Sequence, residues 1–483
     1  MAKRLGDRAK IAHAVIDDRD VSHRTIPKLA AQPDFERGSQ QRLLGKAGDF
    51  RHSRTSENSS WPRLERAELS FARSDLNSFP MIDVVIAGGG PAGLTAAAVT
   101  ARAGLATLVV ERNAAIGVPI RTSGGSWIDE LAALGVPARF FVPMHRISVI
   151  APNAQAVFDY RDARMCVLDV RAFFQWLAEQ AIGAGARIAL RTRADSLLER
   201  AGRVAGLRVR EPDGRIAEIA ASAVIDATGY ASTLARRQHL HEGFAAFGVG
   251  AELDLYAPRW RENEAALIVG RSVAPNGYAW VLPYGGGRVR LGVGIGRPHC
   301  DADPGSYLQE IGRRVSALAP LRDASPIETH AGVVPIAPPR AVALVHDRLV
   351  VAGDAAGQAS ALVGEGIRYA MHAGRLAADA IVAACKTSAA GDRTLVGYPI
   401  AWRRRERNLQ FAFQIYRRIV EFDDADWDRE IAQLNRLSPD EFAQGLKGDF
   451  TLPWLIAIAP RYAGMLVPSR LRRGAGRFAQ RVA

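Results

Sequence analysis

Residues 82–93 of this 483-residue chain read IDVVIAGGGPAG. The first six residues form a short apolar run, which is typical of a strand buried in a parallel sheet. A glycine turn follows at once, and the small residues from about Pro91 to Ala103 predict a helix. A second apolar run, from Thr107 to Val110, completes a strand–helix–strand unit and predicts an α/β fold.

The turn between this strand and helix has the spacing G-x-G-x-x-G, which in this context predicts a dinucleotide site. Gly88 allows the tight turn, Gly90 lets the backbone approach a pyrophosphate, and Gly93 lets the helix pack closely on the strand. The helix N-terminus offers unpaired N–H groups to the phosphates. Glu111 ends the second strand, where its carboxylate can accept hydrogen bonds from ribose hydroxyls.

Three later segments favour FAD over NAD as the dinucleotide. Residues 224–229 (VIDATG) predict a strand that runs into a turn near the cofactor crevice. Residues 349–357 (LVVAGDAAG) predict another strand, after which Asp354 can present its carboxylate to the ribityl or ribose hydroxyls. Residues 364–367 (GEGI) begin a helix whose positive end can face the pyrophosphate or the flavin.

A hairpin is predicted from Gly277 to Gly296, with its turn at residues 285–287. Alternate residues of a strand share a face, so Tyr278, Trp280 and Leu282 point the same way. They form an aromatic and apolar wall that either lines a hydrophobic substrate or fills core between the sheet and helices. Tyr278 is a candidate proton donor by residue type alone.

Composition excludes several other classes of protein. The chain is 48% hydrophobic but has no run of 18 apolar residues, so no spanning helix is expected. Its three cysteines form no C-x-x-C and its histidines no ligand spacing, so we expect no metal site and a cytoplasmic location. The net charge of +13 comes almost wholly from abundant Arg and is no argument for nucleic-acid binding.

The two ends of the chain differ from its centre. Residues 1–80 mix charges without a period, which predicts a disordered extension or a gene-calling artefact with Met81 as the true start. Residues 391–483 predict a helical region. Residues 451–483 are basic and amphipathic, so they either lie on the anionic inner face of the membrane or form a solvated cap.

Residues 81 to about 390 resemble glutathione-reductase-type FAD proteins, in the branch that holds aromatic hydroxylases and geranylgeranyl reductases. Residues 116–125 (IGVPIRTSGG) resemble the Gly-x-Pro-x-Arg-Cys-Gly loop of the geranylgeranyl reductases beside the flavin. Residues 275–283 (PNGYAWVLP) resemble their Pro-x-x-Tyr-x-Trp-x-Phe-Pro motif, and residues 353–366 their Gly-Asp-Ala-Ala-Gly…Gly-Glu-Gly run. Thr122 replaces the loop cysteine and Leu282 replaces the phenylalanine.

The resemblance implies a Rossmann-like FAD-binding domain with an inserted antiparallel substrate sheet and a helical C-terminal region. The FAD-binding domain is expected over residues 81–140, 165–235 and 336–390, and the substrate domain over 141–164 and 236–335. The residues expected to bind FAD are Gly88, Gly90, Pro91, Ala92, Gly93, Glu111, Arg112, Arg121, Thr122, Arg171, Gly229, Gly353, Asp354, Gly364, Gly366 and Ile367.

The function this implies is reduction of carbon–carbon double bonds in a polyprenyl or similar lipid by hydride from reduced FAD. The alternatives are an FAD-dependent monooxygenase on an apolar substrate, a halogenase, and a non-redox flavoprotein of the lycopene-cyclase kind. The sequence has no second G-x-G-x-x-G unit, so the electron donor is either NAD(P)H bound transiently or a reduced carrier protein.

Overall fold

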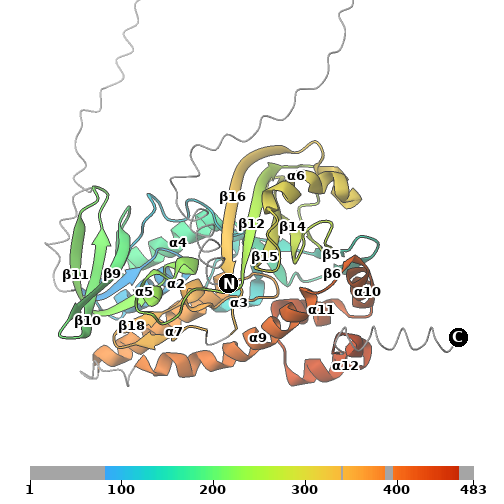
Figure 1. The fold of residues 1–483 in the computed structure, drawn as a ribbon. Coiled ribbons are helices and arrows are strands. Elements are labelled where there is room, and N and C mark those ends of the chain that lie inside the picture. Colours follow the sequence, from blue (N-terminus) through green and yellow to red (C-terminus); the bar gives the residue numbers. More distant parts are fainter. Residues whose placement is uncertain (1–81, 339–340, 387–394, 467–483) are drawn as a thin grey trace, which may run out of the picture. The chain divides into compact units, whose positions relative to one another are not determined.

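The computed structural model describes residues 82–338, 341–386 and 395–466. The predictions for residues 1–80 and for the tail beyond residue 466 therefore concern segments outside the described residues. The fold class is confirmed, because the chain has a parallel sheet, an antiparallel sheet and C-terminal helices (Figure 1).

The first sheet has the central order β17-β18-β11-β1-β2-β8. The six strands of this central order pair in parallel except at β17–β18, and β10 and β9 extend the sheet from β11 by antiparallel pairing. The five apolar residues of β1 are all buried, as the unbroken run predicts for a central strand. The bounds are β1 Ile82–Ala87, β2 Thr107–Val110, β8 Arg187–Ala189, β11 Ile216–Asp226, β17 Val345–His346 and β18 Leu349–Val351.

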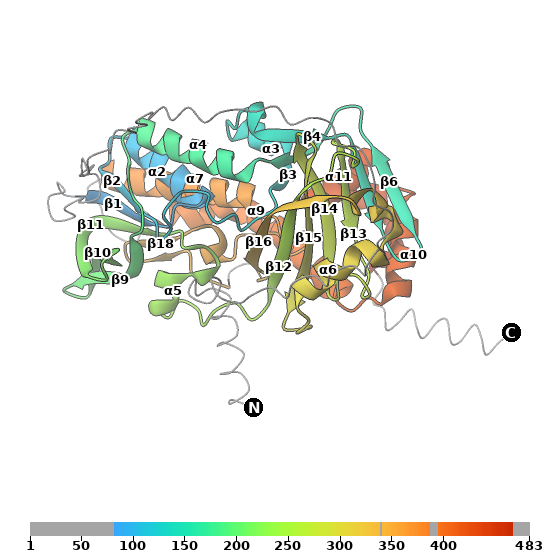
Figure 2. The same cartoon turned by 90° about the horizontal axis from the view of Figure 1, so that it is seen from above.

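One face of this sheet is covered by three helices and the other by a meander. Helices α2 (Pro91–Arg102), α4 (Val170–Gly183) and α7 (Ile367–Lys386) share one core cluster with Val84 and Ile86 (Figure 2). The alternate residues of β1 face a second cluster with the strands β9 (Arg193–Arg200) and β10 (Arg203–Arg210). A turn that includes residues 212–214 joins β10 to β11 in this antiparallel meander.

The second sheet has seven strands in the order β16-β12-β15-β14-β13-β5-β6. All of its pairs are antiparallel except β13–β5. Helix α6 (Pro304–Arg314) packs on one face through Leu308 and Ile311. The bounds are β5 Arg146–Ile150, β6 Gln155–Asp159, β12 Phe247–Tyr256, β13 Glu264–Ile268, β14 Gly277–Gly285, β15 Arg288–Arg297 and β16 Ser325–Pro335.

A small third sheet has the order β3-β7-β4, with β3 Gly125–Trp127, β4 Phe141–Met144 and β7 Met165–Leu168. Its strands come from both sides of the predicted domain boundaries at residues 141 and 164. The domain division itself stays a prediction.

The C-terminal helices are α9 (Gly397–Ile419), α10 (Asp424–Leu434), α11 (Pro439–Lys447) and α12 (Leu452–Leu466). Helices α10 and α11 pack on the second sheet, where Phe442 stacks on Phe158 with ring centroids 3.9 Å apart. Among the described helices, none combines the length and apolarity that a membrane span needs.

Candidate functional site

The glycine turn after β1 depends on its glycines. Gly88 has a φ of +111°, and an ideal Cβ there would lie 2.2 Å from the carbonyl oxygen of Ala227. A Cβ on Gly93 would lie 2.0 Å from the oxygen of Gly88, so only glycine lets α2 pack this closely on the turn. Gly90, the N-cap of α2, has no atom within 4 Å of an ideal Cβ and no side-chain cap. The space beside Gly90 is therefore open at the uncapped N-terminus of α2, where helix N–H groups can bind a phosphate.

Two carboxylates lie at the ends of strands in the first sheet. Glu111 is buried and accepts hydrogen bonds from the N–H groups of Gly89, at 2.7 Å, and Asn113, at 2.8 Å. These bonds fix the carboxylate and leave lone pairs for ribose hydroxyls. Asp354 follows β18, and its Oδ1 lies 3.0 Å from an ideal Cβ on Gly366, directly before α7. Burial raises the pKa of Asp354 to about 6.

Residues 116–125, the loop that leads from β2 to β3, are held against the second sheet. A Cβ on Gly332 of β16 would lie 2.3 Å from the oxygen of Arg121, so the loop backbone touches the strand at a glycine. The guanidinium of Arg290 donates hydrogen bonds to the carbonyl oxygens of Ser123, at 2.8 Å, and Leu168, at 3.0 Å. The loop that resembles the flavin loop therefore lies between the two sheets.

Three more of the predicted cofactor residues lie in turns after strands of the first sheet or at the start of a helix. Gly229 and Gly353 have φ values of +68° and +71° in the turns after β11 and β18. Arg171 lies in the first turn of α4 and pairs with Glu328 of β16, with N–O distances of 3.1 Å. This pair ties α4 to the second sheet. The cofactor contacts of these residues stay predictions.

The aromatic wall is built as the alternation predicts. Tyr278, Trp280 and Leu282 belong to one cluster, whereas Ala279 and Val281 belong to the cluster on the opposite face of β14. The shared face is therefore confirmed, and its role as a substrate wall stays a prediction.

Tyr278 is poorly suited to donate a proton. Its hydroxyl donates a 2.5 Å hydrogen bond to the carbonyl oxygen of Val363. Burial, followed by the negative charges of Glu365 and Glu252, raises the pKa of this phenol. The candidate acid is thus weak, and its proton is already shared with a backbone acceptor.

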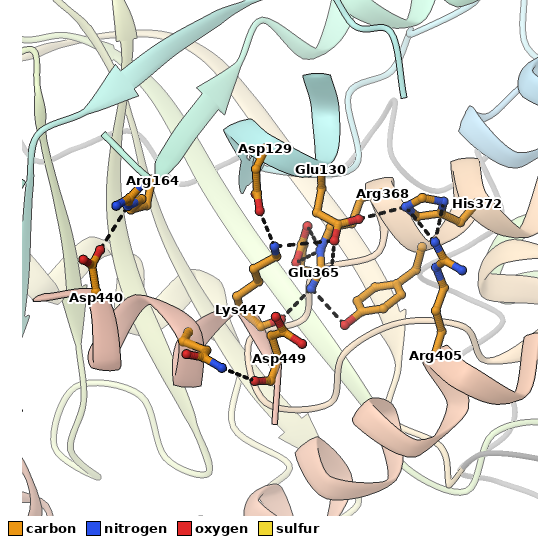
Figure 3. A network of polar contacts seen from close by, with 12 residues as sticks. Asp129, Glu130, Arg164, Glu365, Arg368, His372, Arg405, Asp440, Lys447 and Asp449 are labelled. Atoms are coloured by element: carbon orange, nitrogen blue, oxygen red, sulfur yellow. Dashed lines mark hydrogen bonds and ion pairs between the residues drawn. The ribbon is translucent and has the colours of Figure 1, made fainter. Parts of the chain in front are cut away.

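A network of charged side chains holds the turn of residues 364–366 (Figure 3). Glu365 accepts hydrogen bonds from Arg368 Nε at 2.9 Å and from Ser126 at 3.1 Å. Glu130 of α3 (Ile128–Ala133) lies 2.8 Å from His372 and 3.5 Å from Lys447. The hydrogen bond from His372 is the main cause that lowers the pKa of Glu130 to about 2. The network joins α3, α7 and α11 around the start of α7.

Sequence reasoning missed a second charged cluster, in the second sheet. Glu252 and Asp254 lie on β12, Arg290 on β15 and His330 on β16, and each of these side chains is at most 5% exposed. The alternating acids at 252 and 254 could have predicted two carboxylates on one strand face, because residues at i and i+2 of a strand share a face. The partner strands could not be assigned from the sequence.

Comparison with known proteins agrees with this geometry. Residues 83–241 match the model of the FAD dependent oxidoreductases, and residues 255–334 match the geranylgeranyl reductase catalytic domain. The digeranylgeranylglycerophospholipid reductase 2 of Methanothermobacter thermautotrophicus is 33% identical over 348 residues, which cover 68% of this chain and 86% of that protein. The digeranylgeranylglycerophospholipid reductase of Methanoculleus marisnigri is 33% identical over 381 residues, covering 75% and 92%.

A solved structure shares the fold. The geranylgeranyl bacteriochlorophyll reductase-like protein of Thermoplasma acidophilum superposes with a TM-score of 0.71 at 23% identity, covering 80% of this chain and 98% of that one. Fold and site thus define an FAD-dependent oxidoreductase. The chain belongs to the geranylgeranyl reductase family of these enzymes, as its motifs predicted.

Proposed function

We propose that this chain reduces carbon–carbon double bonds in the polyprenyl chains of a lipid. The observation that carries the proposal is the apolar wall of Tyr278, Trp280 and Leu282, which lies on the sheet that also supports loop 116–125. Relatives named digeranylgeranylglycerophospholipid reductases support a glycerophospholipid with prenyl chains as the substrate.

The residues that would hold FAD are those predicted from the sequence. The backbone of Gly88 to Gly90 and the N-terminus of α2 would bind the pyrophosphate, and Glu111 would accept hydrogen bonds from the ribose. Asp354 and the start of α7 would meet the flavin end, and bound reduced FAD would supply hydride to the alkene.

The protein's own contribution is to orient the prenyl chain and keep water away. Trp280 is 8% exposed, and its indole lies on β15, where an ideal Cβ on Gly292 would be 2.2 Å from its ring. A flat ring over a glycine gives a rigid surface against which an isolated alkene can be aligned. Leu282 makes this surface smaller than the phenylalanine of the family motif would.

The test is anaerobic. Reduced holoenzyme is mixed with a phospholipid that carries two geranylgeranyl chains, and flavin reoxidation and product mass are followed. We expect reoxidation without oxygen and a gain of two hydrogens per double bond. A gain of one oxygen on admission of air would instead identify a monooxygenase, and an unchanged mass would identify a non-redox enzyme.

The electron donor is a separate part of the proposal. We expect either NAD(P)H bound transiently or a reduced carrier protein, as the sequence predicted. Stopped-flow reduction of the flavin by NADH and NADPH tests the first source. Failure of both nicotinamides, together with reduction by a reduced ferredoxin or flavodoxin, identifies the second.

The same lipid substrate suggests contact with a bilayer surface. Leu452 and Ile456 lie one turn apart on α12 and are 69% and 64% exposed. Phe411 of α9 is also exposed and packs on Phe450, with ring centroids 5.9 Å apart. Exposed apolar residues on adjacent helices suit the boundary between headgroups and acyl chains.

A further inference from the structure

The buried charged cluster of the second sheet lies on the same face as the aromatic wall. In the strand register, His330 lies opposite Glu252, Glu252 opposite Gly292, and Gly292 opposite Trp280. Residues directly opposite one another on neighbouring strands share a sheet face. Because Gly292 has no side chain, the Trp280 indole crosses β15 and reaches β12.

The indole makes a direct contact with the cluster there. Trp280 Nε1 donates a 2.7 Å hydrogen bond to Glu252 Oε2. The Ser123 side chain lies beside this carboxyl group and favours its ionised form, and the Ser123 carbonyl oxygen accepts a 2.8 Å hydrogen bond from Arg290. Ser123 lies in loop 116–125 and is partly exposed, whereas the Glu252 side chain is only 5% exposed. Glu252 is therefore a buried acid joined to the loop beside the predicted flavin position.

The neighbours of Glu252 balance one another and leave it the most easily protonated acid of the cluster. Arg290 Nε lies 3.2 Å from Asp254 Oδ1 but 3.9 Å from Glu252 Oε1. Burial opposes the ionisation of Asp254, but His330, whose Nε2 lies 3.3 Å from Asp254 Oδ2, and the charge of Arg290 outweigh it and lower the pKa of Asp254. For Glu252, burial dominates and raises the pKa, although Arg290, Ser123, Trp280 and His330 all oppose it.

A metal site explains this cluster less well. The ligand atoms of Glu252, Asp254 and His330 lie within 4.8 Å of one another, a spacing that could hold an ion. The guanidinium of Arg290 already supplies the positive charge between the two carboxyl groups. A second cation would therefore meet strong repulsion.

Reduction of an isolated alkene requires both a hydride and a proton. We infer that Glu252 is the proton source, and that its proton reaches the substrate through the hydroxyl of Ser123. This inference rests on the proposed function. The hydride from reduced FAD forms one new C–H bond, and the Ser123 proton forms the other as the π bond breaks. Ser123 takes the Glu252 proton in the same step, and the resulting carboxylate regains a proton from water before the next turnover.

The arrangement suits a proton donor in three respects. The carboxyl group is shielded from water, its position is fixed by Trp280, and Arg290 stabilises the carboxylate that proton transfer leaves behind. Tyr278, on the same face, has a higher pKa than an acid of this kind needs and donates to Val363.

The test uses the full-length holoenzyme and the variants Glu252→Gln, Ser123→Ala and Glu218→Gln. The first keeps an acceptor for Trp280 Nε1 but cannot supply the proton. Glu218, which pairs with Arg208 on the exposed side of the meander, is the matched control. We expect anaerobic flavin reoxidation by the prenyl lipid to slow about 100- to 10,000-fold in both E252Q and S123A. The control should react at the wild-type rate.

A second readout does not depend on turnover. The infrared difference spectrum of the wild type minus E252Q at neutral pH should contain the carbonyl band of a protonated buried carboxyl group, and the difference spectrum of the wild type minus the control should not. Reoxidation of E252Q at the wild-type rate overturns the inference for Glu252, and the same result for S123A overturns the route through Ser123. If E252Q does not fold, the reoxidation rate of S123A tests the inference instead. If the wild type itself is not reoxidised by the prenyl lipid, the proposed function fails, whatever the infrared band shows.

Discussion

Gly374 of α7 lies directly against Ala92 of α2, because an ideal Cβ on Gly374 would be 2.1 Å from the carbonyl oxygen of Ala92. Ala92 is the second residue of the helix whose N-terminus faces the glycine turn. The buried parts of both helices are rich in alanine and glycine, which permits this close approach. The packing of α7 therefore fixes the position of the proposed pyrophosphate site.

Gly374→Ala should disturb this site without touching it. The new methyl group meets backbone that cannot rotate away, so we expect a loss of about 1–3 kcal/mol in the free energy of unfolding and weaker FAD retention. Gly312→Ala is the control, since Gly312 lies in α6 with nothing within 4 Å of an ideal Cβ. It should be neutral or stabilise by about 0.5–1 kcal/mol. Equal FAD content in both variants would contradict the link between α7 and the turn.

Arg290→Met should be strongly destabilising. Arg290 is 1% exposed and lies 3.2 Å from Asp254 Oδ1, so its removal takes the nearer of two guanidinium groups away from a buried carboxylate. We expect the free energy of unfolding to fall by about 3–5 kcal/mol. Arg288→Met is the comparison on the same strand. It removes the more distant guanidinium, which lies 4.0 Å from Asp254 Oδ2 and is 42% exposed, and it should lower the free energy of unfolding by less than about 1 kcal/mol. Urea unfolding followed by circular dichroism measures both, and equal midpoints would show that Asp254 does not depend on Arg290.

Asp354 should make the stability of the apoprotein depend on pH. Its pKa is raised from 3.8 to about 6. The stability that its protonated form contributes is therefore fully present below pH 3.8 and is lost as the pH rises through about 6. The free energy of unfolding of apo Asp354→Asn should therefore rise relative to that of the wild type, by about 1–3 kcal/mol, as the pH increases from 4.5 to 7.5. Denaturant titrations at both pH values measure this gain. The same variant should bind FAD more weakly, and a constant difference in stability would contradict the burial of a partnerless carboxyl group.

Glu130 should behave in the opposite sense. Its pKa is lowered from 4.5 to about 2, so its contribution is present above pH 4.5 and is lost as the pH falls through about 2. Glu130→Gln should lower the free energy of unfolding by about 1–3 kcal/mol at pH 7. It should also make the free energy of unfolding depend less on pH at acid pH. Asp129→Asn, at a side chain that is 69% exposed beside Lys447, should cost less than about 1 kcal/mol. Acid unfolding monitored by tryptophan fluorescence distinguishes the two.

The elements that the sequence predicted well are those whose signal is local. Strands Ile82–Ala87 and Thr107–Val110 have the predicted bounds, because short apolar runs between turn residues leave little choice. The shared face of Tyr278 and Trp280 follows from strand alternation alone. The proton-source cluster could not be predicted, because Glu252 meets His330 only through the pairing of β12 with β16.

The charged network around Glu365 was hidden for the same physical reason. Glu365 and Arg368 are one helical turn apart, but their partners Ser126 and Lys447 come from distant segments. The energy of a buried charge depends on every group around it, and those groups meet only in the folded chain.

The exposed apolar residues of α12 should govern binding to membranes. The double variant Leu452→Ser with Ile456→Ser removes two side chains that are 69% and 64% exposed, so its fold should be unaffected. Each apolar side chain that enters the acyl boundary contributes about 1.5–3 kcal/mol, and partial insertion of both predicts at least about a tenfold loss of vesicle binding. Cosedimentation with vesicles of anionic and neutral phospholipid measures it.

The matched control changes Ile216 and Ile327 to Ser, since these residues are 47% and 50% exposed on strands away from the C-terminal helices. Binding should also be stronger to anionic than to neutral vesicles and should weaken with salt, because Arg403, Arg404 and Arg407 are exposed on α9. Equal binding by the two double variants would show that α12 is not the contact. Salt-independent binding would show that the arginines do not take part, and the apolar pair alone would then have to account for the attachment.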